Sequence, residues 1–159
     1  MNKQDLNILK KNYESEIDES KYWDILSNLN NPKVDGFIVK KNNDICGYFF
    51  LAFGKSESEV EKKYLNVEKN GYIFNDYVFE RFRGQKIHQY SIFKRLMILK
   101  EKKYKTATSI IEHNNIASIK SYEKFGFQRY LFKCFFRFDN IIRSNSIIKP
   151  YKKIFRKLR

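Results

Sequence analysis

Apolar residues recur every three or four positions at the start of the chain, which predicts two helices. The first helix, over residues 5–17, has one apolar face formed by Leu6, Leu9, Tyr13 and Ile17. The second is short, begins after Ser20 as its expected N-cap, and carries the apolar residues Trp23, Leu26 and Leu29. The sequence Asn-Asn-Pro at 30–32 then ends the helical pattern.

A hairpin follows, because two strand-like runs enclose a polar turn. The runs are residues 36–40 and 45–53, and the turn is Lys-Asn-Asn-Asp at 41–44. Residues 54–70 are polar and lack strand character, so they form a long loop or a short helix. A loop of that length between strands often carries function.

Strands and helices alternate in the second half of the chain. The pattern predicts a strand over 71–79, a helix over 89–101 and a short buried strand over 106–111. The stripe of the helix is formed by Ile92, Phe93, Leu96, Met97 and Leu99. Asn114 and Asn115 are turn and cap candidates before a helix that runs to Lys124, with Gly126 as its C′ glycine. Residues 127–138 form one long or two short strands.

This order of elements predicts an α/β domain over residues 1–140, with a mixed central sheet flanked by helices. Hydrophobic residues make up 42% of the 159 residues, enough for a core at this length, and the 15 Phe and 11 Tyr make that core aromatic. Cys46 and Cys134 lack metal-ligand spacing, so we expect buried thiols and no metal site. The charged N-terminus is not a signal peptide and no run could span a bilayer, so a cytoplasmic protein is expected.

The charge balance points to an anionic partner. The chain has 32 Lys and Arg against 18 Asp and Glu, a formal net charge of +14. Nucleic acid, a membrane surface or a phosphorylated ligand would each fit such a charge.

Residues 81–90, RFRGQKIHQY, join the strand over 71–79 to the next helix. Free backbone amides and the positive end of the dipole at a helix start bind phosphate, and Gly84 lets the backbone turn or approach a ligand closely. The alternative is the solvated basic start of a surface helix.

A second motif favours the ligand loop. Residues 115–127, NIASIKSYEKFGF, space Asn115, Ser118, Tyr122, Gly126 and Phe127 as N-x-x-[AS]-x-x-x-Y-x-K-x-G-F. Together with V-x-x-x-[FY]-R-G over residues 78–84, this resembles the GNAT N-acetyltransferase superfamily. The resemblance covers roughly residues 35–138.

The resemblance implies a GNAT-like fold that binds acetyl-CoA, as co-substrate, at two splayed parallel strands, here 72–78 and 106–111. The pyrophosphate would lie on the loop formed by Arg83, Gly84, Gln85, Lys86, Ile87 and His88. Pantetheine would pair with backbone at Tyr77, Val78 and Phe79, and its path would pass Asn115 and Ser118. Tyr122 matches the tyrosine that often protonates the leaving thiolate; the alternative is a helix tyrosine that packs on the sheet.

This loop departs from the family pattern, which usually reads R-G-x-G-x-G or R-G-x-G-x-A. Lys86 and His88 replace its second and third small residues, and Glu80 stands where proline is common. Their side chains either crowd the pyrophosphate or point outward, in which case Lys86 adds a charge-assisted contact.

Acetyl transfer also needs an oxyanion donor and a base for the amine. A backbone N–H near Val78 is the candidate donor. Asp76 is one candidate base, because strand alternation places it on the same face as Phe74 and Val78; the alternative is a carboxylate paired with an arginine. His113, just after the other splayed strand, is the second candidate base, and its alternative is a solvated loop histidine. Water could also relay the proton.

Residues 141–159 form a basic tail. After Pro150 the residues Tyr151, Ile154, Phe155 and Leu158 line one helical face with cations opposite, a pattern typical of an interfacial membrane helix. The alternative is a helix docked on its own domain or on a partner in a homodimer. Nucleic acid is disfavoured because no recognition motif accompanies the charge.

The favoured function is acetyl transfer from acetyl-CoA to the primary amine of a small molecule, with an amino sugar in surface-glycan biosynthesis as the suggested acceptor. The basic tail, through residues 149–159, would hold the protein at the inner face of the membrane. One alternative is a GNAT-like module that has lost catalysis and binds anionic membrane or nucleic acid. The other is acetylation of a protein amine.

Overall fold

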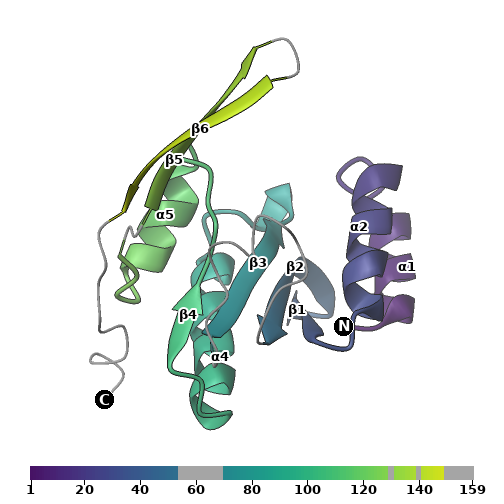
Figure 1. Cartoon of the computed structure of the whole chain (residues 1–159). Helices are drawn as coiled ribbons and strands as arrows, with labels where there is room; N and C mark the ends of the chain where they lie inside the picture. The colour runs from purple at the N-terminus through teal and green to yellow at the C-terminus, as the bar shows by residue number, and fades with distance from the viewer. Residues whose placement is uncertain (54–69, 129–130, 139–140, 149–159) are drawn as a thin grey trace.

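The structure is a computed structural model that describes residues 1–53, 70–128, 131–138 and 141–148, the last two segments as backbone only. Figure 1 shows a central sheet with helices on both sides. The elements in chain order are α1 Lys3–Asn12, α2 Glu19–Asn30, β1 Val34–Lys41, β2 Asp44–Phe53, β3 Asn70–Val78, the 3-10 helix η1 Glu80–Phe82, α4 Ile87–Glu101, β4 Thr106–Thr108, α5 Ile116–Glu123, β5 Leu131–Phe138 and β6 Ile141–Ile148.

The sheet is mixed, as the alternation of elements predicted. Its order is β1-β2-β3-β4, with β1–β2 and β2–β3 antiparallel and β3–β4 parallel. Two cores lie on its two faces. Residues of α1 and α2 pack with Tyr48 and Phe50 on one face, and residues of α4 and α5 pack with Leu51 and Ile73 on the other. The α/β prediction is therefore confirmed.

The N-terminal helices are placed correctly but their ends differ from prediction. α1 ends at Asn12, and Tyr13 and Ile17 remain buried in the turn that follows it. The N-cap of α2 is Asp18, not Ser20, because the Asp18 carboxylate accepts from the amide of Lys21 at 2.7 Å. Trp23 is 61% exposed, so this aromatic ring lies outside the core.

The β2–β3 pair contains a bulge. Tyr48 pairs with Tyr77 and Phe50 with Phe74, so two residues of β3 lie opposite Phe49 alone. Asn75 is the residue that absorbs the extra length, with a left-handed φ of 49°. The Asn75 side chain is fixed by a 2.6 Å hydrogen bond from its amide to Asp24 on α2.

The bulge overturns one sequence expectation. Simple alternation places Asp76 on the face of Phe74, but the extra residue reverses the alternation at that point. Phe74 and Tyr77 both pack in the core beneath α1 and α2, whereas Asp76 bonds to side chains of α4 and α5. Asp76 therefore faces the opposite side of the sheet from Phe74.

The parallel strands separate soon after they pair. β3 pairs with β4 from Asn70 to Tyr72, and among the described residues no strand pairs with this edge of β3 beyond Tyr72. The predicted strand over 106–111 is thus shorter than expected, because β4 ends at Thr108. This divergence confirms the splayed parallel pair.

The last described elements are a strand pair. β5 and β6 form a separate antiparallel sheet, seen alongside α5 in Figure 1. The sequence does not predict β6, because the residues from 141 onward are expected to form the basic tail. The amphipathic pattern after Pro150 and most of the polar segment 54–70 lie outside the described residues.

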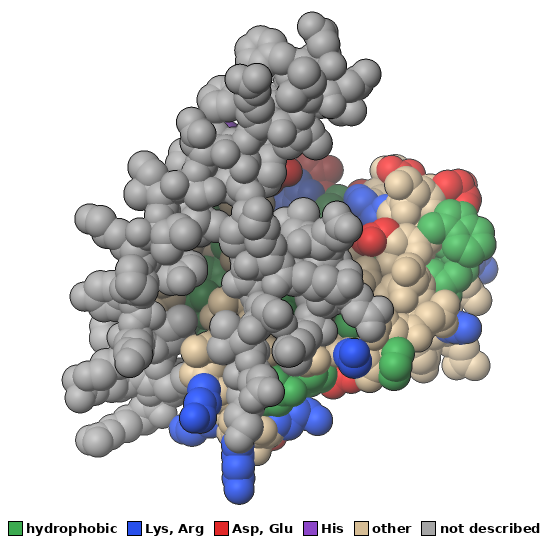
Figure 2. All heavy atoms as spheres, viewed as in Figure 1, with side chains coloured by type: hydrophobic (Ala, Val, Ile, Leu, Met, Phe, Trp, Pro, Cys, Tyr) green, Lys and Arg blue, Asp and Glu red, His purple; other side chains and the backbone are tan. Residues whose placement is uncertain are grey.

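Charge is unevenly spread on the described surface. In Figure 2 basic side chains gather at the lower end, where α4 ends and β4 begins; Lys100, Lys102, Lys103 and Lys105 are exposed there. Acidic side chains lie at the upper end of the α1–α2 side, around the turn that contains Glu14 and Asp18. That turn lies at the end of the sheet where β3 terminates.

Candidate active site

The loop between β3 and α4 contains two left-handed residues. Gly84 has φ 75° and Lys86 has φ 61°. A Cβ on Gly84 would meet nothing within 4 Å, so this glycine is required by its backbone conformation and not by lack of space. Lys86 takes the same conformation against the preference of a residue with a Cβ. The position that is small in the family pattern thus has a left-handed backbone in this chain, although lysine occupies it.

The start of α4 differs from the starts of the other long helices. Side chains of Asn2, Asp18 and Asn115 accept amides at the starts of α1, α2 and α5. In the described part of the chain, no side chain caps α4, whose N-cap is Lys86. The first α4 amides therefore keep their hydrogen-bonding capacity for an anion at the positive end of the helix dipole.

Side chains beside the loop are cationic or tie it to the sheet. The Lys41 ammonium donates to the side-chain oxygen of Gln85 at 2.7 Å, which joins the β1–β2 turn to the loop. Arg83 donates from Nε to the carbonyl of Val78 at 3.3 Å. The Lys86 side chain is exposed. These contacts place Lys41, which the motif did not indicate, beside the predicted pyrophosphate loop.

The backbone at the end of β3 faces two ways. Phe79 donates its N–H to the carbonyl of Cys46 on β2 at 3.0 Å. Along an antiparallel pair, every second residue turns its backbone N–H and C=O toward the partner strand. Tyr77, two residues before Phe79, therefore turns its backbone groups toward β2, and the N–H of Val78 points the other way, into the gap beside β4. Val78 therefore suits the predicted backbone donor. Phe79 is buried and stacks on Tyr13 at 3.7 Å between ring centroids, so its contacts favour a core role.

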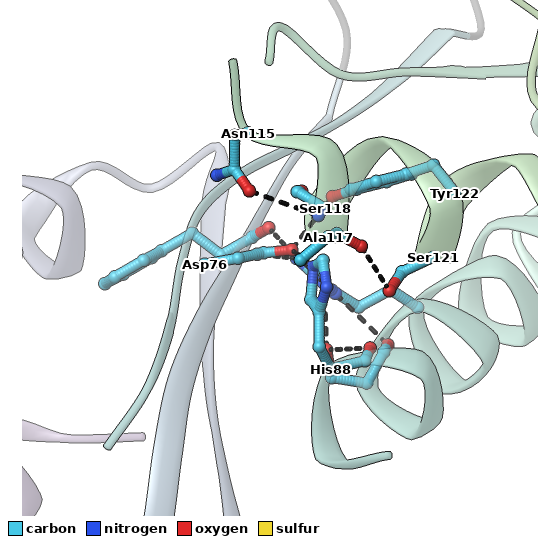
Figure 3. Close-up of polar contacts among 10 residues, drawn as sticks. Asp76, His88, Asn115, Ala117, Ser118, Ser121 and Tyr122 are labelled. Atoms are coloured by element: carbon cyan, nitrogen blue, oxygen red, sulfur yellow. Dashed lines mark hydrogen bonds and ion pairs between the residues drawn. The ribbon is translucent and has the colours of Figure 1, made fainter. Parts of the chain in front are cut away.

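Four side chains meet at the bulge of β3. Arg95 on α4 donates to the Asp76 carboxylate from both terminal guanidinium nitrogens, Nη1 to Oδ1 at 2.5 Å and Nη2 to Oδ2 at 2.8 Å. His88 Nε2 and the hydroxyl of Tyr122 each lie 2.8 Å from that same Oδ2. Figure 3 shows Asp76 between His88 below and Tyr122 above. We call Asp76, His88, Arg95 and Tyr122 the Asp76 cluster.

The Asp76 cluster is nearly closed to solvent. The exposed fraction is 1% for the Arg95 side chain, 12% for Asp76 and 19% for His88. The His88 ring packs edge-on against Tyr122 at 5.4 Å between centroids. The side chain of His88 thus turns inward, away from the loop whose third small residue it replaces.

Charge and burial act in opposite directions on Asp76. Burial disfavours its charged form, but the charge of Arg95 and the hydrogen bonds from His88 and Arg95 outweigh this and lower the pKa of Asp76. Burial first, and then the negative charge of Asp76, raise the pKa of Tyr122 above its ordinary value. Asp76 is thus an ionised carboxylate with both oxygens occupied. The ion pair with Arg95 favours the alternative in which Asp76 is an arginine-paired carboxylate. A role of Asp76 as the general base stays a prediction.

Arg95 was missed at the level of sequence. It lies within the apolar stripe of α4, beside Leu96, and the pattern alone assigned no role to it. It is buried, and besides Asp76 it bonds to the carbonyl of Phe50 at 2.9 Å and to Ser91. A carboxylate in an apolar strand together with Ser91 and Arg95 four residues apart on a helix was the available clue.

The remaining predicted residues lie around α5. Asn115 caps α5 by accepting the amide of Ser118 at 3.1 Å, which confirms its role as a cap (Figure 3). Tyr122 is 3% exposed and turns its hydroxyl to Asp76. His113 is exposed in the turn between β4 and α5. The roles of Asn115, Ser118 and His113 in binding or proton transfer stay predictions.

A family model for the acetyltransferase (GNAT) family matches residues 5–127, most of the chain. The chain belongs to the acetyltransferase (GNAT) family. This confirms the family and the acetyltransferase class that the two motifs indicated. No match was found among curated proteins.

Solved GNAT structures share the fold. The aminoglycoside N-acetyltransferase AAC(6')-Iy, in complex with a bisubstrate analogue built on CoA, is 17% identical with a TM-score of 0.64, covering 86% of this chain and 93% of that one. A ribosomal-protein-alanine N-acetyltransferase from Brucella melitensis is 12% identical with a TM-score of 0.64, covering 87% and 95%. A predicted acetyltransferase from Clostridium acetobutylicum, solved with acetyl-CoA, is 20% identical with a TM-score of 0.52, covering 88% and 86%.

At these identities the solved structures establish the fold alone. The splayed strands, the uncapped α4 and the Asp76 cluster are properties of this chain, described from its own residues. Within the described residues, no helix is long and apolar enough to cross a membrane.

Proposed function

We propose that this GNAT family member transfers the acetyl group of acetyl-CoA to the primary amine of a small molecule. The observation that carries the proposal is the start of α4, where Gly84 and Lys86 turn the loop and leave the helix amides uncapped. A pyrophosphate would accept hydrogen bonds there, with the Arg83 and Lys86 side chains nearby. Two of the solved structures with this fold were crystallised with CoA or acetyl-CoA, which supports the same ligand here.

The chemistry would take place where β3 and β4 diverge. The amine attacks the thioester carbonyl, the N–H of Val78 donates to the developing oxyanion, and the thiolate leaves with a proton from Tyr122. Val78 suits this role because its backbone faces the gap, and Tyr122 because its hydroxyl reaches Asp76 on the same strand.

The acceptor we favour is an amino sugar or a similar cationic amine. The turn between α1 and α2 is acidic, with Glu14, Glu16 and Asp18, and the Glu16 carboxylate bonds to the hydroxyl of Tyr77 at 3.0 Å. A negative surface beside the end of β3 attracts a positively charged amine. The solved structure of AAC(6')-Iy is, by its name, that of an enzyme that acetylates a nitrogen of an aminoglycoside. A place in surface-glycan synthesis and attachment to a membrane stay predictions from the sequence.

Acetyl-CoA titration by thermal shift and calorimetry tests the binding step. Ligand at about 100 times its Kd should stabilise the fold by about 2.7 kcal/mol. The variant Gly84→Asp should weaken binding about tenfold or more, because it brings a negative charge to the phosphate loop. Gly126→Asp is the matched control, since Gly126 also has a positive φ and open space but lies beyond α5. Both variants should lose similar stability, and only Gly84→Asp should lose affinity.

Thiol release in the presence of a panel of amines and amino sugars tests the transfer step. A cationic amino sugar should release CoA faster than a neutral or anionic amine. If millimolar acetyl-CoA neither stabilises the protein nor is consumed with any amine, the proposal is wrong and the non-catalytic alternative gains.

A further inference from the structure

The Asp76 cluster poses a chemical problem for the proposed reaction. Tyr122 donates its hydroxyl proton to Oδ2 of Asp76, an ionised carboxylate. If Tyr122 gave that proton to a departing thiolate and received none in return, a tyrosinate would face a carboxylate at 2.8 Å. Like charges at such a distance in a buried site are strongly unfavourable.

A second proton must therefore reach the pair as the first one leaves. Among the described residues, Arg95, His88 and Tyr122 itself form hydrogen bonds with Asp76. The Ser109 hydroxyl is a hydrogen-bond partner of Tyr122, but a neutral hydroxyl that gave up its proton would itself become an anion in the site. Arg95 cannot supply a proton, because a guanidinium is not deprotonated in proteins. His88 can, because imidazole is the side chain that gains and releases protons near neutral pH.

The position of His88 suits this role. Its Nε2 lies 2.8 Å from the same Oδ2 that accepts the Tyr122 hydroxyl, so one oxygen atom connects the two groups. The His88 side chain is 19% exposed, against 12% for Asp76 and 1% for Arg95, so His88 is the member of the cluster that solvent reaches most easily. Arg95 holds Asp76 in place from the other side.

We propose that His88 supplies, through Asp76, the proton that replaces the one Tyr122 gives to the thiolate of CoA. This inference rests on the proposed acetyl transfer. His88 and Asp76 act through Tyr122 and are positioning residues in this scheme. The position that is small in the family loop pattern thus carries a proton source in this chain.

The amine nitrogen forms a bond to the thioester carbon, the C–S bond breaks and its electron pair goes to sulfur. The Tyr122 hydroxyl turns from Asp76 to sulfur and gives it a proton, while Asp76 Oδ2 passes to the Tyr122 oxygen a proton taken from His88 Nε2. The amine releases its own proton to solvent, and the now neutral His88 takes one back from solvent. The products are the acetamide and CoA with a free thiol.

His88→Gln separates a proton source from a structural donor. The glutamine amide can still donate to Asp76 but cannot titrate. A relay predicts a kcat lowered about tenfold or more in His88→Gln, with the melting temperature and acetyl-CoA Kd close to wild type. The pH profile of kcat should also change shape in His88→Gln, because a glutamine side chain does not ionise.

A proton inventory in mixtures of H₂O and D₂O gives an independent readout. Several protons moving together should make the wild-type plot of kcat curved, and His88→Gln should make it linear. His88→Gln with wild-type kcat and pH profile would overturn the relay while leaving acetyl transfer intact. Failure of the proposed function looks different, because the wild-type protein itself would then transfer no acetyl group.

Discussion

Arg95 and Asp76 form a two-pronged ion pair between α4 and β3, with nitrogen–oxygen distances of 2.5 and 2.8 Å. The pair joins α4, which begins at the loop over residues 83–86, to β3, which lines the gap beside β4. Because Arg95 is 1% exposed, its charge has no access to water if its partner is removed. The stability of the domain should therefore depend on both members.

Replacing one member of the pair should be much worse than replacing both. Asp76→Asn or Arg95→Met leaves a buried charge uncompensated and should lower the free energy of unfolding by about 3–5 kcal/mol. The double variant should lose less than the sum of the two single losses. Urea denaturation of the four proteins measures this coupling, and strict additivity would show that the pair is energetically unimportant.

The stability contributed by Asp76 should depend on pH in a defined direction. Its pKa is lowered in the folded state, below the value of about 3.9 for an unfolded chain. The native state then binds fewer protons than the unfolded state, so this contribution is present above about pH 4 and is lost as the pH falls through the folded pKa.

Asp76→Asn should remove that part of the acid sensitivity. The free energy of unfolding, measured from pH 7 to pH 3, should fall less steeply in the variant than in wild type, even though the variant starts lower. Parallel curves would mean that other carboxylates account for the acid response.

Lys86 adopts a backbone conformation that glycine adopts without strain, since its φ is 61°. Lys86→Gly relieves about 1 kcal/mol of backbone strain in the folded state. Glycine also adds conformational entropy to the unfolded chain, so the net stabilisation should be smaller than that value. Lys103, with φ 59°, is a matched control in the turn after α4. Both glycine variants should gain similar stability in thermal denaturation.

The two lysines should differ in ligand binding. Lys103→Gly should leave the Kd for acetyl-CoA unchanged, whereas Lys86→Gly removes a cation beside the proposed pyrophosphate site and should weaken binding severalfold. Tighter binding by Lys86→Gly would instead show that the lysine obstructs the loop.

In the proposed reaction the Tyr122 hydroxyl acts on the leaving group, so Tyr122→Phe should reduce kcat by about 100-fold or more while changing KM for acetyl-CoA little. The phenylalanine ring keeps the packing against His88 and Phe127. Steady-state kinetics with the preferred amine provide the measurement. Near-normal turnover would remove Tyr122 as the proton donor.

The sequence predicted the bounds of the central elements well. The β2 and β3 strands, the α4 helix and the cap of α5 by Asn115 follow from local patterns, so they could be read without tertiary information. Helix α1 was predicted too long because Tyr13 and Ile17 continue its spacing, yet both are buried by the turn that follows the helix. Burial and helical spacing cannot be distinguished from the sequence alone at such a position.

The site was predicted in parts. Its loop and its tyrosine came from two motifs, but the partners of Asp76 depend on contacts between β3, α4 and α5 that no local pattern encodes. Arg95 was hidden because a buried cation within an apolar stripe looks like a solvent-facing residue. The inward turn of His88 could not be foreseen because it depends on the strand bulge at Asn75.

That bulge has a consequence for comparing this chain with its relatives. A relative whose strand lacks the additional residue must be aligned with a one-residue gap at position 75, between Phe74 and Asp76. A gap placed after Asp76 would equate core residues with site residues. Substitutions that preserve packing at the core positions of β3 would then be mistaken for substitutions that preserve the chemistry of the site.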